Sequence, residues 1–265
     1  MDPFGIVLML SCRKFATARI GACKLTQTDL PPNWILVHVI ADPSHVFKDK
    51  YLFTSIPPMT NLLVLGCEDS YIHLYKKLIF ALTAIYDKYG EPKLGVVRTS
   101  EVKFVDIPLF ISTLQSIPPG ANFMGQVVYS PFIYSNNHMT NYYSTHPGEL
   151  SEYDLTMNHI RQYEHRTIGM TVGCIGKIMY LSWTACHTLI THFNEHGRDV
   201  FTKIGETYPF IVEDTAILFV LYLHKIHVVD CPGLYKSIEY PQNSGEADRS
   251  LDSGTSAPRT PDTSS

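Results

Sequence analysis

Residues able to bind cations or anions follow one short apolar run of the sequence. The run is Leu94–Val97, and Arg98, Ser100 and Glu101 come directly after it. Hard divalent cations prefer oxygen ligands, which a carboxylate supplies. This segment is therefore the first place to look for a binding site.

Two further segments carry groups of the same kind. Glu68 and Asp69 follow the apolar run Asn61–Gly66, so their carboxylates stand at the end of a second predicted strand. Gly176 and Lys177 lie downstream; a glycine lets the backbone approach a ligand closely, and a lysine brings positive charge. Each lysine of this kind is also explained by simple exposure to solvent.

Glu213 and Asp214 precede the apolar run Ala216–Leu223. Acidic residues at the start of a helix stabilise its dipole and cap its backbone N–H groups. A structural role therefore explains this pair without any chemistry, and a functional role for Asp214 needs a separate argument.

Hydrophobic periodicity predicts alternating strands and helices. Strands are expected at Gly5–Ser11, Trp34–Ala41, Asn61–Gly66, Leu94–Val97 continued by Lys103–Ile107, Phe123–Pro131 and Ile226–Val229. Helices are expected at Arg13–Leu25, Ser70–Tyr89, Pro108–Leu114, Trp183–His196 and Glu213–His224, and an irregular loop or lid at Tyr134–Arg166. This order predicts a single α/β domain with a mostly parallel sheet flanked by helices, whose ligands sit beyond the carboxyl ends of the strands.

Composition sets the remaining limits. The chain has 265 residues, 45% hydrophobic and 17% charged, with a net charge of −4 and no basic cluster, so we expect no nucleic-acid partner. The six cysteines form no CxxC pair, and the sequence is compatible either with buried free thiols or with disulfides. No signal or membrane anchor is visible. We expect one domain over residues 1–239 and a disordered tail over 240–265, which is rich in Ser, Thr, Pro, Gly and Asp.

Four segments together resemble the β1,3-galactosyltransferase and N-acetylglucosaminyltransferase superfamily. Arg98–Asp106 resembles its K-T-D-D-D-V-F-V-N strand, and Glu68–Lys77 its F-x-D-S-Y-x-N-L-T-x-K run. Cys174–Ser182 is similar to C-x-G-G-G-Y-V-L-S, and Glu213–Thr215 to the start of E-D-V-Y-V-G. The segments occur in the family's order, over about residues 5 to 230.

The resemblance implies a GT-A fold that transfers a hexose from a UDP-sugar, UDP-galactose or UDP-N-acetylglucosamine, to a glycan acceptor with inversion and a β1,3 linkage. It implies Mn²⁺ as the cofactor and Asp214 as the base that takes the acceptor's proton. It also implies a Golgi or secretory location, although the lack of a visible anchor leaves a cytoplasmic one open. The donor-binding residues by this resemblance are Asp69, Arg98, Ser100, Glu101, Gly176, Lys177 and Glu213.

The sequence departs from the family where the metal should bind. Ser100, Glu101 and Val102 stand in place of three acids, and Val102 replaces the one that holds the metal. Glu101 is then the one acid left, and a Mn²⁺ site should be weak or absent; a solvated strand-end carboxylate explains Glu101 equally well. Lys177 and Ile178 replace two glycines, and their side chains should narrow the pocket. Lys177 or Lys103 could supply the missing positive charge.

Three functions stay open on these grounds: an active hexosyltransferase, a pseudoenzyme that keeps the fold as a binding module, and an unrelated α/β domain. His192 and His196, spaced i, i+4 on a predicted helix, suggest either a zinc site or a polar helix face. The aromatic side chains between Tyr129 and Tyr143 suggest either sugar stacking or ordinary packing. No GxSxG, P-loop or GxGxxG motif occurs, which leaves hydrolase, NTPase and Rossmann functions without support.

Overall fold

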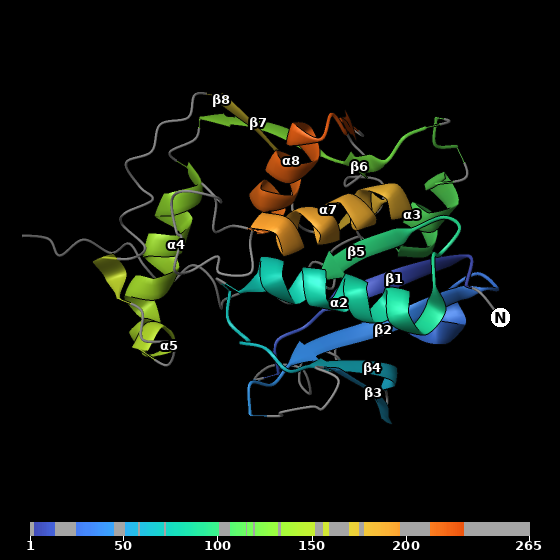
Figure 1. The fold of residues 1–265 in the computed structure, drawn as a ribbon, viewed down its shortest axis with the longest axis horizontal. Coiled ribbons are helices and arrows are strands. Elements are labelled where there is room, and N and C mark those ends of the chain that lie inside the picture. Colours follow the sequence, from blue (N-terminus) through green and yellow to red (C-terminus); the bar gives the residue numbers. More distant parts are fainter. Residues whose placement is uncertain are drawn as a thin grey trace, which may run out of the picture.

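A computed structural model gives the fold of the chain (Figure 1). It describes residues 3–13, 25–44, 51–57, 59–71, 73–100, 107–114, 116–118, 120–131, 134–151, 156–158, 170–174, 178–196 and 213–230. The expected helix at Arg13–Leu25, the strand continuation from Lys103 and the expected tail from residue 240 lie outside these ranges almost entirely.

Apolar runs form one eight-stranded sheet, in the order β10-β6-β9-β5-β1-β2-β4-β3. The strand β1 is buried along its whole length, as expected for a strand covered on both faces. The strands are β1 (Gly5–Leu10), β2 (Trp34–Ala41), β3 (Tyr51–Ile56), β4 (Met59–Leu65), β5 (Val96–Ser100), β6 (Phe123–Gly125), β9 (Ile178–Leu181) and β10 (Val228–Asp230).

The sheet is mixed, with a parallel centre. In register, Ile6 of β1 lies between Ile35 of β2 and Val96 of β5, and both pairings are parallel. The β2–β4 and β10–β6 pairings are also parallel, whereas β3–β4, β5–β9 and β6–β9 are antiparallel. The α/β class is thus confirmed, and four of the seven described pairings in this sheet are parallel.

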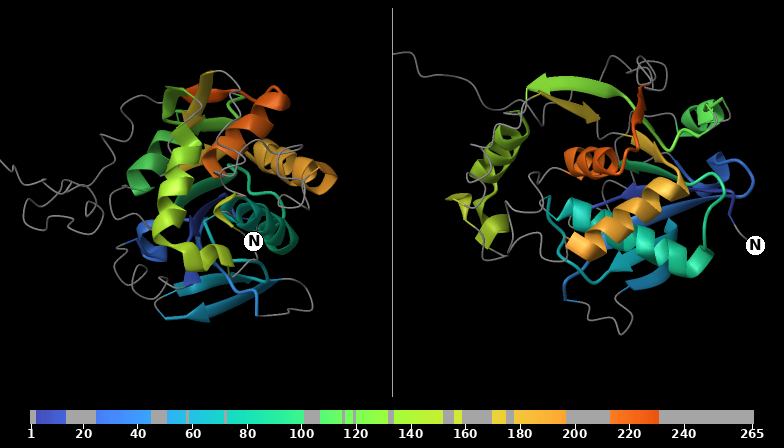
Figure 2. Two further views of the ribbon diagram at one scale, coloured as in Figure 1. Left: turned by 90° about the vertical axis from the view of Figure 1, so that its left-hand side faces the viewer. Right: turned by 45° about the horizontal axis from the view of Figure 1, so that its top comes forward.

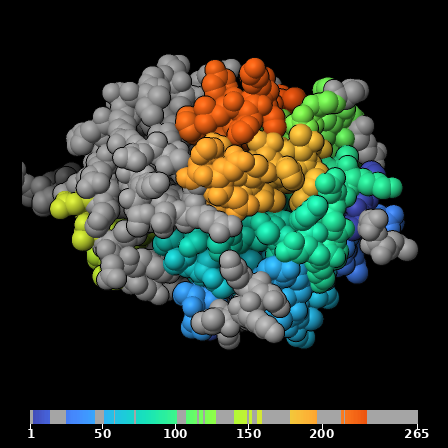
Figure 3. Space-filling view, in the orientation of Figure 1, coloured from blue at the N-terminus to red at the C-terminus, as the bar shows by residue number. Residues whose placement is uncertain are grey.

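Helices cover both faces of the sheet, because successive side chains of each strand point to opposite faces. Ile6 and Leu8 of β1 share a core with α2 (Leu74–Tyr89), α7 (Trp183–His196) and α8 (Glu213–Leu223). Val7 and Met9 instead share a core with α3 (Ile107–Leu114) on the other face. Figure 3 shows α2, α7 and α8 side by side on one side of the molecule. Among the described helices, none is long and apolar enough to cross a membrane.

Two local expectations were wrong. The segment expected to be an irregular loop forms helices α4 (Tyr134–Thr145) and α5 (Pro147–Ser151) in its described part. Its polar composition hid a stretch of twelve residues without Gly or Pro, which is long enough for a helix. The strand expected at Phe123–Pro131 splits: β6 joins the large sheet, while β7 (Val127–Pro131) pairs with β8 (Met170–Cys174) in a separate two-stranded sheet (Figure 2).

Three strands were not predicted from the sequence: β3, β8 and β9. The strand β9 contains four consecutive buried residues, too short a run to distinguish a strand from the start of the following helix. The strand β3 is an edge strand without fully buried residues, so its sequence lacks the clean alternation of a half-buried strand.

Candidate functional site

Polar residues from distant segments meet at the carboxyl ends of the parallel strands. Ser11 follows β1, Asp69 follows β4 and Ser100 ends β5. Because parallel strands finish at the same edge of a sheet, these positions share one end of the molecule. The first residue of α8, Glu213, is brought to the same edge by its contact with Arg98 of β5.

The Arg98–Glu213 contact is a buried ion pair between β5 and α8. Arg98 lies in register with Leu8 of β1, on the sheet face covered by α2, α7 and α8. Its Nε donates to Glu213 Oε1 at 2.8 Å, and its Nη2 contacts the other carboxylate oxygen. Both side chains are only 3% exposed. Such a two-pronged pair fixes both distance and orientation, so it locks the start of α8 to the sheet.

Burial dominates the electrostatics of Glu213. Burial raises the pKa of this carboxyl, Arg98 lowers it and the neighbouring Asp214 raises it, and the net result is a pKa of about 7. Arg98 is the neighbour that favours the ionised form. Without the arginine, the buried Glu213 carboxyl would either keep an unpaired negative charge or have to take up a proton.

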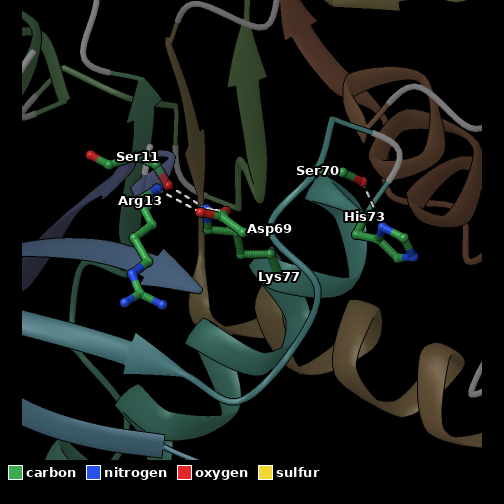
Figure 4. A network of polar contacts seen from close by, with 6 residues as sticks. All are labelled: Ser11, Arg13, Asp69, Ser70, His73 and Lys77. Atoms are coloured by element: carbon green, nitrogen blue, oxygen red, sulfur yellow. Dashed lines mark hydrogen bonds and ion pairs between the residues drawn. The ribbon is translucent and has the colours of Figure 1, made fainter. Parts of the chain in front are cut away.

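A second buried cation, Lys77 of α2, organises the ends of β1 and β4. Its Nζ donates to Asp69 Oδ1 at 2.5 Å and also contacts the carbonyl oxygen of Ser11. The backbone N–H of Arg13 donates to the other oxygen of Asp69 at 2.5 Å. Figure 4 shows the Lys77 side chain reaching toward Asp69 and Ser11. Lys77 is 2% exposed, so the ion pair is part of the core.

Lys77 is a residue whose role the sequence reasoning missed. It lies three positions after Leu74 and one before Leu78, within the face of α2 that packs on the sheet. A lysine on the buried face of an amphipathic helix needs a buried partner, and this was the available signal.

Tyr71 brings Asp214 and α4 into the same neighbourhood. Burial, then the charges of Asp214 and Glu213, raise the pKa of the Tyr71 hydroxyl to about 12, against the effect of Arg98. The Tyr71 ring also lies 5.5 Å from that of Tyr142 on α4, centre to centre. Asp214 itself is half-buried. The carboxylate of Asp214 and the phenol of Tyr71 therefore stand where α4 meets the edge of the sheet.

Ser70 and His73 close the turn that leads into α2. Ser70 Oγ and His73 Nδ1 are 2.6 Å apart, and their side chains point toward each other in Figure 4. Burial lowers the pKa of His73 to about 4, while nearby Glu68 acts in the opposite direction. His73 is 3% exposed, so this pair stabilises the turn rather than facing a ligand.

Of the predicted site residues, Asp69, Arg98, Ser100, Glu213 and Asp214 occupy this one edge. The others, Glu101, Gly176 and Lys177, lie outside the described residues, as do Val102 and Lys103.

Ile178 was expected to narrow the pocket, and this was wrong. It begins β9, pairs with Thr99 of β5 and is fully buried in the core under α3. Its side chain therefore fills the interior.

The described acids do not fit a Mn²⁺ site. Glu213 is neutralised by Arg98, and Asp69 by Lys77. Within the described residues, no group of three or more His, Cys, Asp or Glu is arranged to hold a metal ion. A divalent cation would have to compete with two buried ammonium or guanidinium groups for these oxygens, which costs more than it gains.

Two further sequence expectations concern side chains away from the edge. Tyr143 is fully buried, which fits packing rather than sugar stacking. His192 contacts His224, which follows α8, and among the described residues no metal-binding group includes it. Cys67 and Cys186 are buried thiols, and burial raises the pKa of Cys67 to about 12, so this thiol is unreactive at neutral pH. A shallow depression near Asn122 and His227 lies at the opposite edge of the sheet.

Comparisons with known proteins add little to this geometry. No protein-family model matches the chain, and no curated protein matches it. Among solved structures, the chain is similar to mouse xyloside xylosyltransferase 1 in its apo form, at 9% sequence identity, with 88% of this chain and 86% of the other covered. The TM-score of that match is 0.39, a level at which it carries no argument about fold family or activity.

Proposed function

We propose that the chain is a glycosyltransferase-like protein of GT-A type that binds a nucleotide-sugar at the carboxyl edge of its sheet. One observation carries the proposal. The buried Arg98–Glu213 pair joins the two sequence segments that resemble the donor-binding strand and the base-bearing helix of the β1,3-hexosyltransferases. These segments are 115 residues apart, and a shared ligand site requires them to meet.

The proposal divides the residues into two roles. Arg98 and Glu213 neutralise each other in the interior, so they position the start of α8 and do not contact a donor. Asp214, the next residue, is half-buried and is the proposed base for the acceptor hydroxyl. Asp69, held by Lys77, fixes the loop after β4. Ser100, Glu101, Gly176 and Lys177 are proposed to contact the donor.

The chemistry is a displacement at the anomeric carbon. Asp214 takes the proton of the acceptor hydroxyl as its oxygen attacks, and the UDP leaves from the opposite face with its electron pair. Mn²⁺ would neutralise the leaving diphosphate in such a reaction. Since the described acids do not fit that ion, the proposal assigns the positive charge to Lys177 or Lys103.

A pseudoenzyme is the second candidate, and one observation favours it. Two of the acids at the edge, Asp69 and Glu213, are each already paired with a cation. An edge whose acids are already paired can still bind a ligand, but without the Mn²⁺ that the resemblance implies. In this alternative Asp214 is a helix cap and the edge is a binding surface.

Calorimetry with UDP, UDP-galactose, UDP-N-acetylglucosamine and UDP-xylose, with and without EDTA, tests the proposal. We expect binding of UDP and of at least one UDP-sugar that EDTA does not weaken. Release of UDP in the presence of a saccharide acceptor would establish the enzyme, and binding without release would favour the pseudoenzyme. If no nucleotide binds under any condition, the proposal is wrong in both forms.

A further inference from the structure

Two histidines from different helices meet at the contact between α7 and α8. His192 Nδ1 of α7 lies 3.1 Å from Nε2 of His224, the residue that follows the last turn of α8. His192 is 7% exposed, and the ring of His196 lies 4.7 Å from its own, centre to centre. Figure 1 shows α8 lying directly against α7. These imidazoles play no part in the proposed carbohydrate site.

A contact between two ring nitrogens depends on proton count. One nitrogen must carry a proton and donate, and the other must be bare and accept. A neutral pair satisfies this rule, and so does a pair that has gained one proton. After a second proton both nitrogens carry hydrogen, neither can accept, and two positive charges face each other at hydrogen-bond distance.

The surroundings of His192 add to the cost of that second proton. Burial lowers the pKa of His192, and the rings of His196 and His224 lower it further, while Glu195 on the same helix acts in the opposite direction. Glu195 is 61% exposed, so water screens its charge. From α2, the side chains that meet α7 here are aromatic: Tyr75 and Phe80 pack on Phe193.

We propose that His192 and His224 form an acid-sensitive contact that holds the end of α8 against α7 at neutral pH and opens when both rings are protonated. The direction follows from the proton count of the contact. Acid supplies the second proton, which removes the acceptor nitrogen and favours the open arrangement. The test is confined to the last turns of α8, because Glu213 at its other end has a pKa raised to about 7 and gains a proton over the same pH range.

Amide hydrogen exchange of the intact protein at pH 7 and pH 5 tests this, after correction for the intrinsic exchange rate. In the wild type, amides in the last turns of α7 and α8 should lose protection at pH 5 relative to pH 7, because the open arrangement is more populated in acid. His224→Gln keeps a hydrogen-bonding side chain without a titrating group and should abolish this step. His187→Gln, at an exposed position on α7, is the matched control and should keep the step.

Equal protection at both pH values in the wild type, or an undiminished step in His224→Gln, would overturn the proposal. A titration of the wild-type imidazoles by NMR gives a second reading that needs no variant. The pKa of His192 should lie below the ordinary histidine value, because its ring is buried beside other imidazoles. Titration of His192 at the ordinary value would also overturn the proposal, whether or not the protein binds nucleotide-sugars.

Discussion

The guanidinium of Arg98 contacts both carboxylate oxygens of Glu213 in the interior of the protein, although the two residues are 115 positions apart in the sequence. The pair connects the central strand β5 to the first turn of α8. It is therefore the contact that sets where Asp214 stands relative to the sheet.

Removing either partner of this pair should be costly. Arg98→Ala or Glu213→Ala leaves the other charge buried and unpaired, and we expect a loss of about 3–5 kcal/mol in the free energy of unfolding, measured by urea denaturation. The double variant Arg98→Met with Glu213→Leu should lose less than the two single variants summed. Lys76→Ala is the control: its pair with Glu68 is part-exposed and should cost about 1 kcal/mol or less. A small effect of Arg98→Ala would contradict the assigned role.

Gly95, immediately before β5, should tolerate no side chain. Its φ is +88°, and a Cβ there would lie 2.3 Å from the carbonyl oxygen of Leu181. Gly90 has a φ of +71° but nothing within 4 Å of the same atom, so Gly90→Ala carries the strain of backbone conformation without a clash. Thermal denaturation should show Gly90→Ala losing about 1 kcal/mol and Gly95→Ala clearly more. Equal losses would show that the β5–β9 pairing relaxes around the added carbon.

His38 should make the protein lose stability in acid. It is 4% exposed in β2, and burial lowers its pKa to about 4. The unfolded chain takes up a proton near pH 6.5 and the folded chain only near pH 4, so stability is complete above 6.5 and falls as the pH drops toward 4. The expected slope is about 1.4 kcal/mol per pH unit from this group.

Urea denaturation at pH 7 and pH 5 measures this slope. His38→Leu should lower it by the contribution of this one group, while His73, with its pKa also near 4, keeps its own contribution in the same direction. His187→Leu, at an exposed site, should leave the slope unchanged. An unchanged slope in His38→Leu would mean that His38 gains its proton without unfolding.

Asp214→Asn separates the two roles open to this residue. An asparagine caps a helix nearly as well as an aspartate, so the melting temperature should change little. It accepts no proton, so turnover should fall about a hundredfold or more if Asp214 is the base, while calorimetric affinity for UDP-sugar is kept. Glu195→Gln, at an exposed position of α7, is the control. Turnover that survives Asp214→Asn would remove Asp214 from the mechanism.

Local pattern was enough to predict much of the fold. The apolar runs of β1, β2 and β4 and the amphipathic spacing of α2 appear in the sequence because each depends on neighbours within a few residues. The α/β class followed from their alternation. The position of β9, antiparallel between β5 and β6, could not be predicted in this way. It depends on strands that are far away in the sequence.

The candidate site divides in the same way. The sequence alone singled out Asp69, Arg98, Glu213 and Asp214, because the segments that contain them resemble the motifs of a known family and occur in its order. It could not show that Arg98 and Glu213 form an ion pair with each other, or that the buried Lys77 pairs with Asp69. Those facts depend on which face of β5 and α2 turns inward and on what packs there. A charge buried far from water must find its partner in space, and tertiary packing alone decides which residue that partner is.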